Sequence, residues 1–361
     1  MKKNMQTEMV EVTRLIRAGR LKEATAMIQH TLAGSSTTNV VEAKPGHADA
    51  PIEAEFRVLN SPSFSRQPPP SMSASVHTSG QFVEKTYTNT AGKRSYKLYI
   101  PGDYTGQVVP LVIMLHGCTQ TSTNFATGTR MNMLAERETF LVAYPEQGHS
   151  ANTSKCWNWF KESDQRRNAG EPSLIAGITQ QIMSMYHVDV RRVYIAGLSS
   201  GGAMAAIMAA TYPDLYAAVG VHSGLAFGAA HDLPSAFTAM KQGKIQHTRQ
   251  LKEMVPLITF HGDRDTTVAP ANADRLLDQW LQGANKGRDV KVERGQVPDG
   301  HAYTRSIHHD SNGQAIIEKW TVHQAGHAWS GGSPSGSYTN PKGPDASAEM
   351  MRFFVEHPKK M

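Results

Sequence analysis

The sequence predicts an α/β protein with a mostly parallel β-sheet covered by helices on both faces. From about residue 81 onward, short apolar runs alternate with helical stretches, which is the pattern of parallel strands joined by crossover helices. In addition, the segment Gly197-Leu198-Ser199-Ser200-Gly201 joins one such run to the next helical stretch. A serine between glycines at that position is typical of a sharp strand-to-helix turn.

The first 80 residues are predicted to lie outside the sheet. Residues 7–33 repeat apolar side chains at helical spacing, so residues 1–33 are expected to form a helical N-terminal extension. Residues 34–80 are rich in proline and serine and are expected to form an extended linker, because they bury too little apolar surface to offset backbone entropy. The extension is expected either to dock on the sheet domain or to be dispensable.

The remaining segment, residues 81–361, is expected to be a single sheet domain that begins with a hairpin. Phe82–Thr88 and Ser95–Ile100 are predicted strands on either side of a glycine-containing turn. The later strands are apolar throughout, as expected for strands buried on both faces, and they are Val108–Leu115, Phe140–Tyr144, Val193–Ala196, Ala217–Val221, Leu257–His261 and Ile316–Val322. Helices are predicted at Gly128–Arg137, Ser173–Tyr186 and Ala203–Ala210.

Composition argues against several classes of function. The formal net charge is +6, but Lys and Arg are scattered and form no dense basic run, which disfavours a nucleic-acid partner. No apolar run is long enough to span a bilayer, so no membrane association is expected. Lys2 and Lys3 are not followed by the apolar segment of a secretory signal. Two cysteines are too few for a disulfide framework or a cysteine zinc site, although they could form one bridge.

Ser199 is the candidate nucleophile. Arg192–Ala196 is a predicted strand before it, and Gly202–Met208 opens an apolar helix after it. A serine hydroxyl is a weak nucleophile and needs a base, usually a histidine oriented by a carboxylate. In folds with this turn, the acid and then the histidine follow the serine along the chain.

The acid and the base are expected in loops that follow later strands. Asp263 and Asp265 both lie just after the predicted strand ending at His261, and residues alone leave the choice between them open. His327 lies on a glycine-flanked loop after Ile316–Val322 and is the candidate base. Among the other histidines, His222 and His261 are expected to be structural, whereas His301, His308 and His309 are expected in a polar loop with no metal.

An oxyanion hole needs backbone N–H donors close to the nucleophile. One is expected from Ser200, the residue after the nucleophile, and the other from Cys118, in the loop after the early strand that ends at Leu115. Trp157, Trp159 and Trp329 could line a substrate pocket or pack in the core. Trp159, Trp329 and His116 are the candidates for substrate contact.

Several motifs together resemble the polyhydroxybutyrate (PHB) depolymerase family of esterases, which is related to feruloyl and acetylxylan esterases. They are Leu115-His116-Gly117-Cys118-Thr119-Gln120, Gly197-Leu198-Ser199-Ser200-Gly201-Gly202-Ala203-Met204, His261-Gly262-Asp263-Arg264-Asp265 and Gly326-His327-Ala328-Trp329-Ser330-Gly331-Gly332, within a resemblance that covers roughly residues 80–356. The resemblance implies an α/β-hydrolase fold, no cofactor and a triad of Ser199, Asp265 and His327. It also maps an oxyanion donor onto Cys118 and makes a Cys118–Cys156 disulfide plausible.

The resemblance leaves the substrate open. Polymer depolymerases of this family usually carry a C-terminal linker and a polymer-binding domain, whereas this chain ends at Met361 soon after the hydrolase motifs. We therefore expect a small ester or polyester oligomer as substrate, with a feruloyl or acetylxylan esterase as the alternative. A non-catalytic binding protein on a hydrolase scaffold is the rival from another class. The sequence shows no secretory signal, which suggests the cytoplasm, although the resembled family is often secreted. It does not indicate an oligomeric state.

Overall fold

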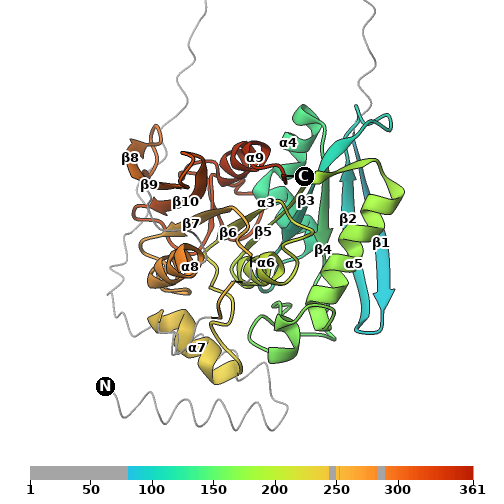
Figure 1. The fold of residues 1–361 in the computed structure, drawn as a ribbon, viewed down its shortest axis with the longest axis horizontal. Coiled ribbons are helices and arrows are strands. Elements are labelled where there is room, and N and C mark those ends of the chain that lie inside the picture. Colours follow the sequence, from blue (N-terminus) through green and yellow to red (C-terminus); the bar gives the residue numbers. More distant parts are fainter. Residues whose placement is uncertain (1–79, 244–248, 252, 283–288, 361) are drawn as a thin grey trace, which may run out of the picture. The chain divides into compact units, whose positions relative to one another are not determined.

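The computed structural model describes residues 80–360 except 244–248, 252 and 283–288. These residues are built around a ten-stranded sheet in the order β1-β2-β4-β3-β5-β6-β7-β10-β9-β8 (Figure 1). The central strands from β4 to β10 in this order pair in parallel, and antiparallel pairs close both ends of the sheet. This confirms the predicted α/β class. The predicted helical extension and almost all of the predicted linker lie outside the described residues.

The strands of the large sheet are β1 Gln81–Asn89, β2 Gly92–Ile100, β3 Val109–Leu115, β4 Leu141–Pro145, β5 Val188–Leu198, β6 Ala218–His222, β7 Leu257–Gly262, β8 Val290–Gln296, β9 Ala302–His309 and β10 Ala315–Val322. The α-helices are α3 Ser122–Thr129, α4 Met131–Glu138, α5 Gly170–Met185, α6 Ser200–Thr211, α7 Leu233–Gln242, α8 Ala271–Gln282 and α9 Ala346–Glu356, with a short 3-10 helix at Glu162–Gln165. A two-stranded parallel pair joins β11 Trp329–Ser330 to β12 Thr339–Asn340.

The apolar strands are buried on both faces because the sheet separates two cores. Along β3, Leu111, Ile113 and Leu115 face one hydrophobic cluster, whereas Val112 and Met114 face the other. Side chains of α5, α6, α7 and α8 belong to the first cluster, and those of α3, α4 and α9 belong to the second. Alternate side chains of a strand point to opposite faces, so a strand between two cores must be apolar at every position.

Two sequence predictions about secondary structure are wrong. The helix expected at Gly128–Arg137 is divided, because Arg130 has a left-handed backbone (φ 56°) that ends α3 and starts α4. Its guanidinium donates hydrogen bonds to the Gly331 carbonyl at 2.6 Å and to Asp345 at 2.8 Å, which hold the break in place. His308 and His309 do not lie in a polar loop but on β9, which pairs with β8 and β10.

Candidate active site

Ser199 lies on the sharp turn between β5 and α6. Its backbone has φ 56° and ψ −117°, a conformation that residues other than glycine rarely adopt. Its N–H donates to the His222 carbonyl at 2.9 Å. Strained backbone of this kind persists only where its surroundings fix it. The turn therefore presents the serine side chain at the carboxyl edge of the sheet, as the motif predicts.

The glycines of the motif are required by the packing around this turn. A Cβ on Gly197 would lie 2.4 Å from the backbone of Gly201, and a Cβ on Gly201 would lie 2.1 Å from the Leu115 carbonyl oxygen. Both distances are far below any real carbon contact. The elbow can thus pack against the end of β3 only when both positions lack a side chain.

Asp265 and His327 form a hydrogen-bonded pair in which the carboxylate is buried and the imidazole is partly exposed. The Nδ1 atom of His327 lies 2.7 Å from Oδ2 of Asp265, whose side chain is fully buried. The other carboxylate oxygen accepts the N–H groups of Thr267 and Val268, both at 2.9 Å. Burial raises the pKa of Asp265, but hydrogen bonds from His261 and His327 outweigh burial and leave that pKa well below its usual range. The carboxylate is therefore charged and fixed in orientation.

Asp263, the other acid that the residues left open, points elsewhere. Its carboxylate lies 2.9 Å from Nδ1 of His323 and accepts the N–H of Gln324 at 2.6 Å. The side chains of Asp263 and His323 are each 38% exposed. Asp263 thus shapes the loop that leads to His327, and Asp265 is the acid that contacts the histidine.

The sheet brings the three triad candidates together because they follow neighbouring parallel strands. Ser199 follows β5, Asp265 follows β7 and His327 follows β10, and these strands are adjacent apart from β6, which lies between β5 and β7. The carboxyl ends of parallel strands meet at one edge of a sheet. A Cβ on Gly262, at the end of β7, would lie 2.3 Å from the Ala325 carbonyl oxygen, which shows how closely the His327 loop crosses this edge.

His222, at the end of β6, connects the Ser199 turn to the loop that carries His327. Its carbonyl accepts the Ser199 N–H, and its ring nitrogen Nε2 accepts the Ser330 N–H at 2.9 Å. The ring is stacked between Phe260 and Trp329. Burial lowers the pKa of His222 to about 3, so the ring is neutral and can act as this acceptor. The sequence-based view of His222 as a structural residue fits these contacts.

The loop after β3 leaves one backbone donor free beside Ser199. The N–H of Gly117 donates to the side chain of Gln120 at 2.8 Å, that of Thr119 to the Ser154 carbonyl at 2.8 Å, and that of Gln120 to the Gly117 carbonyl at 3.3 Å. Among the described residues, the intervening Cys118 N–H has no such acceptor. A Cβ on Gly117 would lie 3.6 Å from the Ser199 Cβ, so this loop adjoins the nucleophile.

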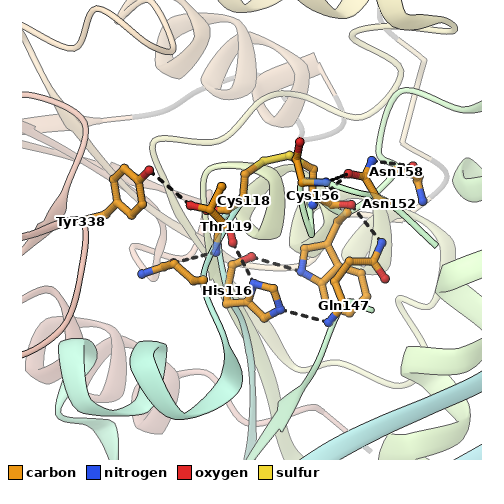
Figure 2. The surroundings of a disulfide bond; sticks show 12 residues. His116, Cys118, Thr119, Gln147, Asn152, Cys156, Asn158 and Tyr338 are labelled. Atoms are coloured by element: carbon orange, nitrogen blue, oxygen red, sulfur yellow. Dashed lines mark hydrogen bonds between the residues drawn. A yellow bond between two sulfur atoms is a disulfide. The ribbon is translucent and has the colours of Figure 1, made fainter. Parts of the chain in front are cut away.

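A disulfide bond between Cys118 and Cys156 holds this loop to the loop after β4, as the resemblance implies (Figure 2). The segment around Cys156 is itself held in place by buried polar side chains. Gln147 donates to the Cys156 carbonyl at 2.9 Å and also contacts the buried carboxylate of Glu171. Glu171 in turn accepts the backbone and side-chain N–H groups of Asn158, each at 2.7 Å. The loop after β3, which contains Cys118, is thus tied to α5 through the disulfide and a buried polar network.

Two of the three residues expected to contact substrate are interior residues instead. His116 is completely buried, with Nε2 accepting the Gln147 N–H at 3.0 Å and Nδ1 donating to the Gly117 carbonyl at 2.7 Å. Trp329 is 1% exposed and donates to the Ser347 hydroxyl at 3.1 Å. The polar atoms of both side chains form hydrogen bonds inside the protein, so these residues support the loops of the site and do not face a substrate. Trp159 is 5% exposed and its role stays a prediction.

Other kinds of site find little support in the described part of the chain. It contains no group of three or more His, Cys, Asp or Glu side chains that could hold a metal ion, and none of its helices is long and apolar enough to cross a membrane. A cavity of about 450 Å³ is lined by β1, β2, the start of α3 and the loop after β4. None of the triad candidates lines it, and its Glu146 is paired with Lys155 at 3.1 Å.

Comparison with known proteins identifies relatives among esterases. The chain is 32% identical over 270 residues to poly(3-hydroxyalkanoate) depolymerase C of Paucimonas lemoignei, covering 71% of this chain and 63% of that protein. It is 31% identical over 223 residues to a probable acetylxylan esterase A of Neosartorya fischeri (56% and 59% covered) and 30% identical over 252 residues to feruloyl esterase B of Neurospora crassa (64% and 83% covered). The chain thus spans about three fifths of the length of the first two relatives.

A solved structure supports the fold. An acetyl xylan esterase from Aspergillus awamori superimposes with a TM-score of 0.58 at 21% identity, covering 76% of this chain and 99% of that one. At this level of identity the likeness concerns the α/β-hydrolase fold alone. The sequence model of the family described as esterase PHB depolymerase matches residues 94–291, more than half of the chain. The chain therefore belongs to the PHB depolymerase family of esterases.

Proposed function

We propose that this protein is a serine esterase that hydrolyses carboxylic esters through an acyl-enzyme on Ser199. The observation that carries the proposal is the hydrogen bond of 2.7 Å between the buried Asp265 and His327, in loops at the same sheet edge as the strained Ser199 turn. A charged acid, an oriented imidazole and a serine on a sharp turn are the parts that nucleophilic ester hydrolysis needs. Membership of an esterase family supports the same chemistry.

In the first half of the reaction, His327 takes the proton of the Ser199 hydroxyl while the serine oxygen forms a bond to the ester carbonyl carbon. The carbonyl oxygen becomes an oxyanion, which the N–H groups of Cys118 and Ser200 stabilise, each by roughly 3–4 kcal/mol. The tetrahedral intermediate then collapses, the carbon–oxygen bond to the alcohol breaks, and the alcohol receives the proton from His327. Asp265 fixes the imidazole tautomer and stabilises its charged form throughout.

In the second half, water replaces the alcohol. His327 removes a proton from the water as its oxygen attacks the acyl-enzyme carbonyl, and the same oxyanion donors act again. Collapse of this second intermediate breaks the bond to Ser199, which recovers its proton from His327, and the carboxylic acid leaves. Every proton and electron pair is accounted for by these three side chains, so the reaction needs no cofactor.

The proposed substrates are hydroxyalkanoate oligomers or short-chain esters. A relative that is 32% identical is named a poly(3-hydroxyalkanoate) depolymerase, which favours a polyester-derived substrate. Feruloyl or acetylxylan ester hydrolysis is the second candidate, favoured by the feruloyl esterase whose length is 83% covered. A panel containing hydroxybutyrate oligomers, methyl ferulate and acetylated xylan distinguishes these, since each candidate predicts a preference for its own ester.

The nucleophile is tested by Ser199→Ala, with Ser184→Ala on the exposed surface of α5 as the matched control. We expect Ser199→Ala to abolish hydrolysis of p-nitrophenyl esters and labelling by a fluorophosphonate probe, while the thermal unfolding midpoint stays close to that of the wild type. Ser184→Ala should keep both activities. Undiminished turnover in Ser199→Ala would exclude the triad, and a wild-type protein that resists the probe would favour a non-catalytic binding protein.

A further inference from the structure

Tyr338 is an exposed aromatic side chain between the two loops that carry the reactive groups. Tyr338 is 48% exposed, and every other Phe, Tyr and Trp among the described residues is more buried. Single exposed apolar residues are common on protein surfaces. The position of Tyr338 therefore matters more than its exposure.

On one side, Tyr338 contacts the loop after β3, which carries the proposed oxyanion donor Cys118. Its hydroxyl lies 3.3 Å from the hydroxyl of Thr119, the residue after Cys118 (Figure 2). The preceding residue, Ser337, is held to the same region, because its carbonyl accepts the side chain of Gln120 at 2.9 Å and its hydroxyl contacts Asn124 at 2.6 Å. The Tyr338 hydroxyl is thus held against Thr119, the residue next to Cys118 in sequence.

On the other side, Tyr338 contacts the loop that carries the proposed base, His327. Its carbonyl accepts the N–H of Trp329 at 2.7 Å, two residues after His327. The next residues continue this contact, since Thr339 and Asn340 pair with Trp329 and Ser330 as β12 and β11. An ester between the oxyanion donor and the base would therefore lie next to the segment that carries Tyr338.

The backbone of Tyr338 is strained. Its φ is 52°, in the left-handed region, and Thr119 has φ 65°. A bulky or β-branched residue in this region is an outlier that the surroundings must stabilise. Packing does not require a tyrosine here, because half of its side chain faces solvent. A ring held rigidly and left exposed can bind a ligand with little loss of side-chain entropy.

We propose that the face of the Tyr338 ring binds the hydrocarbon part of the substrate next to the scissile ester. The inference rests on the proposed esterase function and identifies one of its specificity determinants. The ligand class is an ester with an apolar carbon chain, such as an aliphatic acyl group or the methyl-bearing backbone of a hydroxyalkanoate. The hydroxyl of Tyr338, which faces Thr119, is not part of this contact.

The test compares the KM values of p-nitrophenyl acetate and p-nitrophenyl octanoate. Tyr338→Ala should raise the KM of the octanoate by about five-fold or more and that of the acetate by less than about two-fold, because the lost apolar contact grows with chain length. The kcat should change little, as expected for lost uniform binding. Tyr338→Phe, which keeps the ring, should retain both KM values within about two-fold of the wild type.

Two further variants make the outcome decisive. Tyr338→Asn also removes the ring but suits a left-handed backbone, so it provides the same comparison if the alanine variant does not fold. Met185→Ala is the matched control, because Met185 is 47% exposed at the end of α5, and it should change neither KM.

The inference is overturned if removal of the ring changes both KM values equally, or if Tyr338→Phe loses as much as Tyr338→Ala, since the hydroxyl would then act by bracing Thr119. Ser199→Ala is the blank in every assay. Wild-type turnover no greater than this blank would instead overturn the proposed function, and this inference with it.

Discussion

Asp265→Asn should lower kcat by about 10³–10⁴-fold, because it changes which ring nitrogen of His327 carries the proton. In the wild type, one carboxylate oxygen of Asp265 accepts the N–H groups of Thr267 and Val268, and the other contacts Nδ1 of His327. The amide oxygen of an asparagine must take the first position, because it is the only acceptor there. The amide NH₂ would then face Nδ1, so that the histidine proton moves to Nε2 and the ring can no longer accept the Ser199 proton.

The magnitude follows from the lost charge as well as from the tautomer. At 2.7 Å and an effective dielectric constant of about 20, a full charge on each partner interacts by roughly 6 kcal/mol. This stabilises the imidazolium that forms when His327 takes the proton. The new hydrogen bond to the asparagine recovers part of that energy, which leaves a barrier increase of about 4–5 kcal/mol, consistent with the expected loss of rate.

Asp263→Asn is the matched control, because Asp263 lies two residues away and also contacts a histidine. Its partner is His323, and both side chains are 38% exposed, where solvent screens the interaction. We expect its kcat to fall by less than about three-fold. The assay is kcat for p-nitrophenyl butyrate at pH 8, with circular dichroism to verify folding. Equal losses in the two variants, or a larger loss in Asp263→Asn, would refute the assignment of the acid.

Three further predictions concern the loops, the buried histidines and the N-terminal residues. Replacing both Cys118 and Cys156 by serine should lower the free energy of unfolding by about 3–4 kcal/mol, as expected for cysteines 38 residues apart. It should also lower kcat by about ten-fold, because the loop that carries the Cys118 N–H is no longer held in place. Urea unfolding measures the first effect and steady-state kinetics the second, and an unchanged kcat would show that the disulfide contributes to stability alone. Burial lowers the pKa of His116 to about 4 and that of His222 to about 3, so the unfolded chain binds more protons as pH falls below about 6.5, and the free energy of unfolding should decrease by roughly 1.4 kcal/mol per pH unit for each histidine. His222→Gln should remove one of these two contributions in urea titrations between pH 7 and pH 4.5, whereas an unchanged slope would show that His222 takes no part. Deletion of residues 1–79 should leave a cooperatively unfolding, active domain, and loss of that unfolding transition would place these residues within the fold.

Secondary structure was predictable where it depends on local pattern. The apolar runs that became β3, β5 and β7 are recognisable because strands between two cores must be apolar on both faces. The edge strand β8 and its neighbour β9 were not recognised, because most of their residues are exposed or only partly buried and their polar side chains resemble those of a loop. The break at Arg130 was not predicted either, since contacts with Gly331 and Asp345, more than 200 positions away, help to hold it.

The residues of the candidate site were likewise predictable only where a local sequence pattern marks them. The positions of Ser199, of an acid at Asp263 or Asp265, and of His327 after their strands followed from the chain order that is typical of folds with this turn. Tyr338 carries no such signal, because the seven residues before it are only glycines, serines and a proline. Its proposed role comes from its contacts with Thr119 and Trp329. The opposite error concerned Trp329 and His116, which adjoin reactive residues in sequence but point into the interior.

The sequence by itself determined the sharp turn at Ser199, because the glycines around this serine leave the backbone few other ways to pass between a buried strand and a helix. It also determined the fold class, since alternating apolar runs and helices have few compact solutions. The residues alone left Asp263 and Asp265 open, and the family resemblance favoured Asp265 and Cys118. Only the tertiary structure showed that Asp265 contacts His327 while Asp263 contacts His323, and placed Tyr338 against Thr119. Those choices depend on distances of a few ångströms between loops far apart in sequence, and such distances are set by how the strands pair and pack.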